Sequence, residues 1–256
     1  MILEEVKEAF VKDVVAAGKR VDGRGLLDYR DVRVEKNVLP NAEGSALAHF
    51  GDTKVLAGVK FDLMEPFPDK PNEGVITFNS EFSPIAHPEF EPGPPREESI
   101  ELARVVDRGI RSAGVIDLKK FLQEDGKVLG LFVDLYTIDH SGNLIDAAAL
   151  AAMAALSCTR VPVYKDGKIS REEFTGPLEL KRKVVTASFE KISGKTVADA
   201  RYEEEIASDG RLTTACTDDG FVAAMQKSGA AGFSKQEVND LIALSFEKTK
   251  PLLSKV

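Results

Sequence analysis

The sequence lacks tryptophan altogether and contains only two cysteines and three histidines among 256 residues. Cys158 and Cys216 lie far apart and form no Cys-x-x-Cys pair, which argues against a zinc ribbon or a redox-active dithiol. We expect both to be reduced and largely buried thiols. No two histidines stand at the spacing of metal ligands, so the sequence predicts no metal site.

Long apolar runs and net positive charge are also lacking. The longest mainly apolar run, residues 144–158, has 15 residues, whereas a membrane-spanning helix needs about 20. The first residues show no basic leader followed by an apolar core, and we therefore expect a cytoplasmic protein. The net charge of −8 argues against a uniformly basic nucleic-acid binder, because such binding depends on clustered Lys and Arg.

The composition that remains is typical of a folded protein, with 43% hydrophobic and 30% charged residues. Apolar residues at helical spacing predict an amphipathic helix over residues 2–17, which docks as a lid or an interface. Proline-rich segments at 65–71 and 84–95 predict loops. A capping box at Ser234 opens the last helix, which we expect to reach about residue 250 and to stop or kink at Pro251.

Strand and helix patterns alternate twice along the chain. Further helices are predicted at 96–112, 118–123 and 144–157. Strands are predicted at 32–38, 45–50, 54–61, 74–82, 127–138, 161–163, 168–169, 178–189, 196–198, 212–216 and 221–227. We interpret the chain as one α+β domain over 1–256, with two similar halves at about 20–155 and 156–256, because no linker separates them.

Three arginines form the most informative pattern. Arg104, Arg108 and Arg111 fall within a roughly 60° arc of the predicted helix and span about 10 Å of it, enough to meet successive phosphates of a single strand. Arg96 stands at the start of the helix and could extend either this surface or the alternative to it. The alternative is a solvated face with ion pairs, because Glu101 stands three residues before Arg104 and Asp107 four before Arg111.

Other candidate sites are weak. His140 and Ser141 are a base next to a nucleophile, but no Gly-x-Ser-x-Gly elbow surrounds them, and we expect residues 140–143 to cap the following helix. No Walker loop or Gly-x-Gly-x-x-Gly is present. We interpret residues 203–205 as a solvated acidic run and residues 218–220 as a hairpin turn. Asp209 is the one nearby acid that stays a candidate.

Several motifs occur together in one order along the chain. They are residues 20–24 (RVDGR), 44–46 (GSA), 51–55 (GDTKV), 96–97 (RE) and 101–111 (ELARVVDRGIR). Together they resemble the RNase PH family over nearly the whole chain. Within that family, the helix before Arg20 and the loop at 93–95 are most similar to the non-catalytic RNase PH-like subunits of the archaeal exosome.

The resemblance implies a ribosomal-protein-like β-α-β-α-α fold in two halves. It also implies a hexameric ring, built as a trimer of heterodimers with a catalytic RNase PH-like subunit and capped by RNA-binding subunits. Such a ring degrades single-stranded RNA from the 3′ end with inorganic phosphate, which the partner's active site uses; no cofactor of this chain is implied. The resemblance places Arg104, Arg108, Arg111 and Arg96 among the RNA-binding residues.

Departures from the catalytic pattern determine the expected role. Active relatives carry an Arg in the phosphate loop that resembles residues 141–143, and Asn143 stands there instead. They carry an essential Asp in an acidic turn, where this chain has Arg211 with Asp209 before it. We therefore expect no catalytic residues and no turnover by this chain alone. Two alternatives stay open: an active phosphorolytic exoribonuclease relying on Asp209, and a purely architectural subunit whose arginines never contact RNA.

Overall fold

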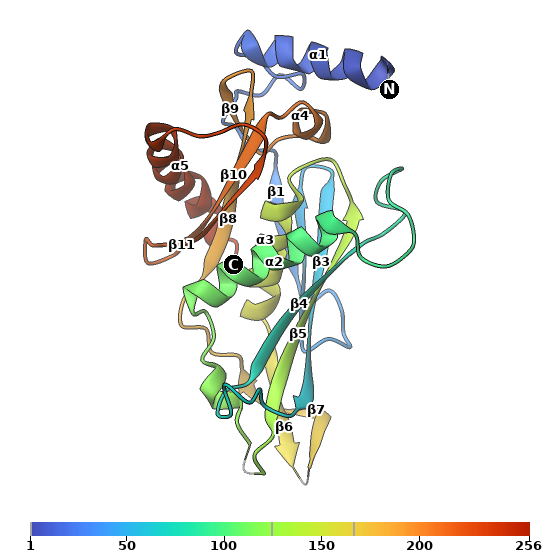
Figure 1. Ribbon diagram of the computed structural model, residues 1–256. Coiled ribbons are helices and arrows are strands. Elements are labelled where there is room, and N and C mark those ends of the chain that lie inside the picture. The colour runs from blue at the N-terminus through green and yellow to red at the C-terminus, as the bar shows by residue number, and fades with distance from the viewer. Residues whose placement is uncertain (1, 124, 166) are drawn as a thin grey trace.

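The first half of the chain forms a five-stranded sheet. The computed structural model describes residues 2–123, 125–165 and 167–256, with side chains from Glu5 onward (Figure 1). The strand order is β1-β2-β3-β5-β4, antiparallel except for β4 beside β5. Its strands are β1 (Val32–Lys36), β2 (Gly44–Phe50), β3 (Thr53–Met64), β4 (Val75–Phe82) and β5 (Val128–Asp139). The β2–β3 hairpin turns at Gly51, whose φ of 56° favours glycine.

Two helices cover the inner face of this sheet. On β3, every second residue from Val55 to Phe61 is fully buried, which is the period-2 pattern of a sheet with one covered face. The covering helices are α2 (Glu97–Ala113) and α3 (Leu144–Ser157), and α2 crosses in front of the strands in Figure 1. Helix α3 is buried from Leu144 to Leu156, because its small alanine side chains let β2, β3 and β8 approach closely.

The second half forms a four-stranded antiparallel sheet with the order β11-β10-β8-β9. Its strands are β8 (Val184–Ile192), β9 (Lys195–Ala198), β10 (Gly210–Thr217) and β11 (Val222–Gly229). Helix α5 (Lys235–Leu253) lies against β8 and β10, while α2 and α3 contact this sheet as well as the first. The α+β class and the arrangement in two halves are as the sequence predicts.

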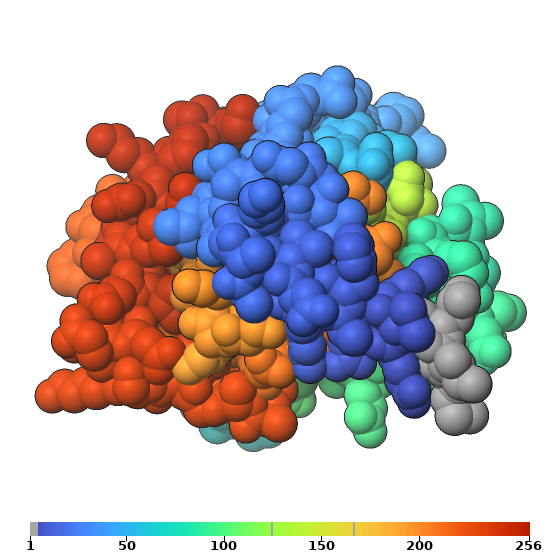
Figure 2. Space-filling view, turned by 90° about the horizontal axis from the view of Figure 1, so that it is seen from above, coloured from blue at the N-terminus to red at the C-terminus, as the bar shows by residue number. Residues whose placement is uncertain are grey.

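Helix α1 (Ile2–Ala16) lies across one end of the molecule (Figures 1 and 2). Its Val11 and Val15 are buried in a small separate core with Ile192, Val197, Ala200 and Ala207. Val6 and Phe10, by contrast, are 61% and 58% exposed. Among the side chains that the structure describes, those of the C-terminal part dock the helix on the second half.

Several predicted elements need correction. Strand β8 begins at Val184 rather than at 178, because residues 178–183 connect the halves, with the Lys181 N–H donating to the Val115 carbonyl at 2.8 Å. The two short strands predicted at 161–163 and 168–169 form one longer ribbon, β6 (Arg160–Lys165) and β7 (Lys168–Pro177). The expected helical stretch at 118–123 is a single 3₁₀ turn, Leu118–Phe121.

One helix was not predicted, and one helix ends later than predicted. A short helix, α4 (Tyr202–Ile206), was not predicted, because five residues are too few to show a helical period. Pro251 does not stop α5, which continues to Leu253. In the last turn proline costs only one intrahelical hydrogen bond. No helix in the described part of the chain is long and apolar enough to cross a membrane.

Candidate functional site

Helix α2 presents the arginines as the sequence predicts. It begins after Arg96 with Glu97 and Glu98 in the first turn, where acidic groups favour the helix dipole, and ends at Gly114 in the left-handed conformation. The buried face carries Leu102, Val105, Val106 and Ile110 among others. Arg104, Arg108 and Arg111 are all exposed on the opposite face. One face of α2 is therefore core, and the other is cationic.

The arginines differ in their partners. Arg104 has no hydrogen bond or ion pair with any residue that the structure describes. Arg108 donates from Nη1 to the Gln226 amide oxygen at 3.1 Å. Arg111 donates to Asp107 at 2.6 Å and to the Ile76 carbonyl at 2.9 Å. Arg96, at the entrance to α2, pairs with Glu91 of the proline-rich loop.

The i, i+4 ion pair expected from spacing is therefore made, but the i, i+3 pair is not. Glu101 turns away from Arg104 and accepts a hydrogen bond from the Ser228 hydroxyl at 2.7 Å. Its carboxylate also lies 3.6 Å from the Arg211 guanidinium. Arg104 and Arg108 consequently keep their positive charge without an acidic partner among the described residues.

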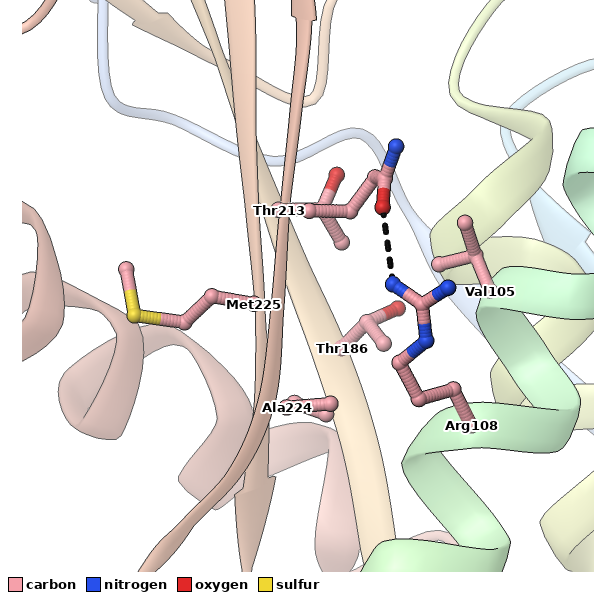
Figure 3. Close-up of a pocket in the computed structure, with 8 residues that line it drawn as sticks. Val105, Arg108, Thr186, Thr213, Ala224 and Met225 are labelled. Carbon is pink, nitrogen blue, oxygen red and sulfur yellow. Dashed lines mark hydrogen bonds between the residues drawn. The ribbon is translucent and has the colours of Figure 1, made fainter.

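A small cavity lies between α2 and the second sheet, beside Arg108 (Figure 3). Its volume is about 10 Å³, room for about one water molecule. Val105 borders it from α2, and Thr186 and Thr213 border it from β8 and β10. Too small for a ligand, it marks the seam where the two halves of the chain meet under the cationic face.

The turn before α3 is the second candidate, because helix N-termini expose N–H groups that attract phosphate. All three of its N–H groups are already engaged. Ser141 N–H donates to the Thr53 hydroxyl at 3.0 Å, Gly142 N–H to His140 Nδ1 at 3.3 Å, and Asn143 N–H to the Glu205 carboxyl at 2.7 Å. Residues 141–143 therefore offer no free backbone donor to a phosphate, although no side chain caps α3 itself.

The start of α4 closes over the same turn. Gly142 has a φ of +92°, and a Cβ added there would lie 2.3 Å from the Ala200 carbonyl oxygen and 2.6 Å from the Tyr202 nitrogen. The Arg30 guanidinium donates to the carbonyls of Ser141 and Gly142 at 2.8 and 3.2 Å. Backbone and side chain together fill the space beside the α3 N-terminus.

The position of Glu205 at this turn disfavours the ionised form of its carboxyl group. Burial of its carboxyl group, and to a lesser extent the neighbouring Glu190, raise its pKa to about 8. The Asn143 N–H and the guanidinium groups of Arg211 and Arg30 act in the opposite direction. Because its pKa lies near 8, Glu205 is mostly protonated at neutral pH, and it competes with a phosphate by occupying the Asn143 N–H rather than by its charge.

A buried polar network continues inward from the turn. The Asn143 amide donates to Asp146 at 3.0 Å and to Asp199 at 2.9 Å. Asp146 is fully buried and also accepts from Thr186 and Ser188; burial raises its pKa despite these donors. Burial would also raise the pKa of Asp199, but hydrogen bonds from Arg30 bring it below its usual value. Asn143 thus acts as a structural link rather than as a ligand-binding cation.

The interpretation of residues 203–205 as a solvated acidic run is wrong for two of the three. Glu204 is 2% exposed and pairs with buried Arg20, at 2.8 Å to Nε and 2.5 Å to Nη2. Glu205 binds Asn143, and only Glu203 is exposed. The partners stand far away in the sequence, 184 residues in the case of Arg20, so no local pattern could have revealed them.

The side chains of Asp209 and Arg211 both bind other residues of the fold. Asp209 accepts from the Ser193 N–H at 3.0 Å and lies 3.4 Å from the ammonium group of Lys12 on α1. Arg211 lies between Glu101 and Glu190, at 3.6 and 4.0 Å. Residues 218–220 form the β10–β11 hairpin turn, as predicted from the sequence.

His140 belongs to a cluster of rings rather than to a catalytic pair. Its ring stacks on Phe90 at 5.5 Å and meets His87 and Tyr202 edge-on at 5.4 and 5.1 Å. Burial lowers its pKa to about 4, helped by His87 and Arg30. Nδ1 accepts from the Gly142 N–H. No group of three or more His, Cys, Asp or Glu residues within the described ranges could hold a metal ion.

The two halves of the chain match the two domains of one family of proteins. The models of the 3′ exoribonuclease family match this chain with domain 1 over residues 28–162 and domain 2 over residues 184–248. The chain belongs to this family, the RNase PH family.

Individual members of the family are similar to this chain over nearly its whole length. The chain is 42% identical to exosome complex component Rrp42 of Thermococcus onnurineus, covering 98% of this chain and 96% of that protein. It is 44% identical to exosome complex component Rrp42 of Methanosarcina acetivorans, covering 98% and 93%. A solved Archaeoglobus fulgidus exosome with RNA bound to the active site contains a chain 41% identical, with a TM-score of 0.92 over 100% of this chain and 99% of that one. Rice Rrp46, 19% identical with a TM-score of 0.69 over 91% and 95% of the two chains, shares the fold.

Proposed function

We propose that this chain is a non-catalytic subunit of an archaeal-type exosome, which completes the RNA-binding surface of a catalytic RNase PH-like partner. The observation that carries the proposal is the hydrogen bond from Asn143 N–H to Glu205, because it places the chain's own carboxyl group where a phosphate-using enzyme needs a free donor. The relatives named exosome complex component Rrp42 support the assignment to an exosome.

The reaction of the assembly follows from the class. Inorganic phosphate, bound at the partner's active site, attacks the last phosphodiester at the 3′ end and releases a nucleoside diphosphate. This chain contributes cations that hold the RNA while the partner reacts. Arg104 and Arg108 are suited to this role, because exposed guanidinium groups without acidic partners bind phosphate oxygens in forks.

The same proposal covers assembly and compartment. We place the chain in a hexameric ring, built as a trimer of heterodimers with the catalytic subunit and capped by RNA-binding subunits, in the cytoplasm. The solved exosome with RNA at its active site, in which a chain 41% identical to this one is found, supports RNA as the substrate. A net charge of −8 is compatible with this role, because single-strand binding needs a local cationic surface and does not need a net positive charge on the whole protein.

Two competing functions make different demands on the residues. An active enzyme would need Asp209 as its acid, and that carboxylate is engaged by Ser193 and faces Lys12. A purely architectural subunit would have its arginines neutralised. Arg111 and Arg96 meet that description, but Arg104 and Arg108 do not.

The test uses the chain reconstituted with its catalytic partner. Fluorescence anisotropy with labelled single-stranded RNA compares wild type with the double variant Arg104→Glu/Arg108→Glu. The control is Arg33→Glu on β1, which reverses the charge of another exposed arginine, one that pairs with Asp31 away from α2. We expect the double variant to bind RNA at least about tenfold more weakly and the control to bind normally. Unchanged affinity in the double variant would support the architectural function.

A second assay tests catalysis. The lone chain, incubated with 3′-labelled RNA and inorganic phosphate, is expected to release no nucleoside diphosphate, whereas the mixture with the partner does. Release by the lone chain that disappears in Asp209→Ala would make this chain an enzyme and overturn the proposal.

A further inference from the structure

Gln226 holds the middle arginine of α2 from the opposite side of the seam. It lies on β11, the edge strand of the second sheet, directly across from Thr213 of β10. Its amide oxygen accepts from Arg108 Nη1 at 3.1 Å, and the dashed line in Figure 3 marks this bond beside the small cavity. One end of the bond belongs to the first half of the chain and the other to the second.

The partner is an amide and not a carboxylate, which changes what the bond does. A carboxylate orients a guanidinium but also cancels its charge, as Asp107 does for Arg111. An amide oxygen fixes the direction of one N–H and leaves the positive charge and the remaining donors of the guanidinium available. Arg108 is therefore oriented without being neutralised.

The acid two turns before Arg108 on α2 is held by the same strand. Glu101 accepts from Ser228 on β11 and faces Arg211. Ser228 and Gln226 stand two residues apart on β11 and so present their side chains to the same face of the strand. Strand β11 thus holds the acid and the cation of α2 at separate points.

We infer that Gln226 is a positioning residue for RNA, which orients the Arg108 guanidinium over the seam between the halves while leaving its charge free for a phosphate of the strand. The inference rests on the proposed contact between α2 and RNA. It adds that RNA binding by Arg108 also depends on Gln226 of β11, which the proposed contact by itself does not require.

The experiment measures RNA affinity of the reconstituted complex over a series of salt concentrations. Gln226→Met keeps the side chain's length but removes the acceptor, and Gln226→Glu keeps the acceptor but adds a charge. We expect Gln226→Met to weaken binding about threefold with an unchanged salt slope. We expect Gln226→Glu to weaken it by a similar or larger factor, with the slope reduced by about 0.7, the value of one phosphate contact on a single strand.

Controls separate positioning from structure. Gln236→Met makes the same substitution on α5, where Gln236 bonds only to Asp240 on the helix surface, and should bind RNA like wild type. Unfolding midpoints should stay equal in all these variants. Combining Arg108→Ala with Gln226→Met should cost no more affinity than Arg108→Ala alone, because both act through one contact.

Two outcomes would overturn the inference. One leaves the proposed function intact, and the other removes part of it. If Arg108→Ala weakens RNA binding while both Gln226 variants bind like wild type, the positioning role is wrong and the proposed function stands. If Arg108→Ala itself leaves binding unchanged, Arg108 makes no RNA contact, and the positioning role fails together with that part of the proposed function.

Discussion

The backbone N–H of Asn143 donates to the carboxyl group of Glu205 over 2.7 Å, although 62 residues separate the two in the chain. This bond joins the N-terminus of α3 to α4 and uses the donor that an incoming anion would need. The chain therefore engages the N–H of the residue that precedes α3 with a carboxyl group of its own. We assign RNA binding to the arginine face of α2 instead.

The ionisation of Glu205 should make stability depend on pH. Its pKa is raised from 4.5 to about 8 in the folded protein, so protonation stabilises the fold below about pH 4.5, and this contribution is lost as pH rises through 8. Glu205→Gln keeps an oxygen acceptor for Asn143 and cannot ionise. Its unfolding free energy relative to wild type should increase by on the order of 4 kcal/mol between pH 5 and 9.

Urea denaturation at a series of pH values measures this difference. Glu203→Gln is the matched control, because Glu203 is exposed on the same helix, and its difference from wild type should stay flat. A flat profile for Glu205→Gln as well would mean that Glu205 titrates normally.

Removing Glu204 should destabilise the fold strongly. The Arg20 side chain is fully buried and donates from Nε and Nη2 to the Glu204 carboxylate. Glu204→Ala therefore leaves an uncompensated buried charge. The expected loss is roughly 3–5 kcal/mol of unfolding free energy. Glu203→Ala, one residue earlier, should change stability by less than about 0.5 kcal/mol. A loss below about 1 kcal/mol in Glu204→Ala would show that the pair contributes little.

Asp209→Ala should leave the activity of the assembled complex intact. The Asp209 carboxylate accepts from Ser193 N–H and faces Lys12, so its expected contribution is about 1 kcal/mol of stability. Phosphate-dependent release of nucleoside diphosphate, measured in the reconstituted complex, should equal that of wild type. A large loss of activity without unfolding would assign Asp209 a role in the reaction.

Single alanine substitutions along α2 should differ in their effect on RNA. Arg104→Ala should weaken RNA binding more than Arg111→Ala, because Arg111 is already bound by Asp107 and the Ile76 carbonyl. The salt slope should fall by about 0.7 for Arg104→Ala and by less for Arg111→Ala. Anisotropy titrations of the complex at several salt concentrations give both quantities. Equal effects would mean that the Asp107 pair opens when RNA binds.

Much of the fold follows from local sequence signals. Ser234 and Glu237 form the predicted capping box, with Ser234 N–H donating to the Glu237 carboxylate at 2.7 Å and Glu237 N–H donating back to the serine hydroxyl at 3.2 Å. The boundaries of α2 and α3 agree with the predicted ranges within a residue or two. Where the local signal was short or mixed, as in α4 and residues 178–183, prediction failed, because contacts with other segments decide the conformation there.

The sequence by itself determined which residues of α2 are cationic and which are core, because helical periodicity is a property of the local chain. It also determined that Asn143 stands at the turn before α3. Only the tertiary structure decided which charges are neutralised: Glu101 faces Arg211, Arg108 meets an amide, and Glu204 and Glu205 turn inward to Arg20 and Asn143. These pairings join segments more than 60 residues apart. The buried pairings are selected by the packing of the two halves, since a buried polar group must find a partner wherever the packing places one; the exposed bond between Arg108 and Gln226 forms because the same packing brings α2 beside β11.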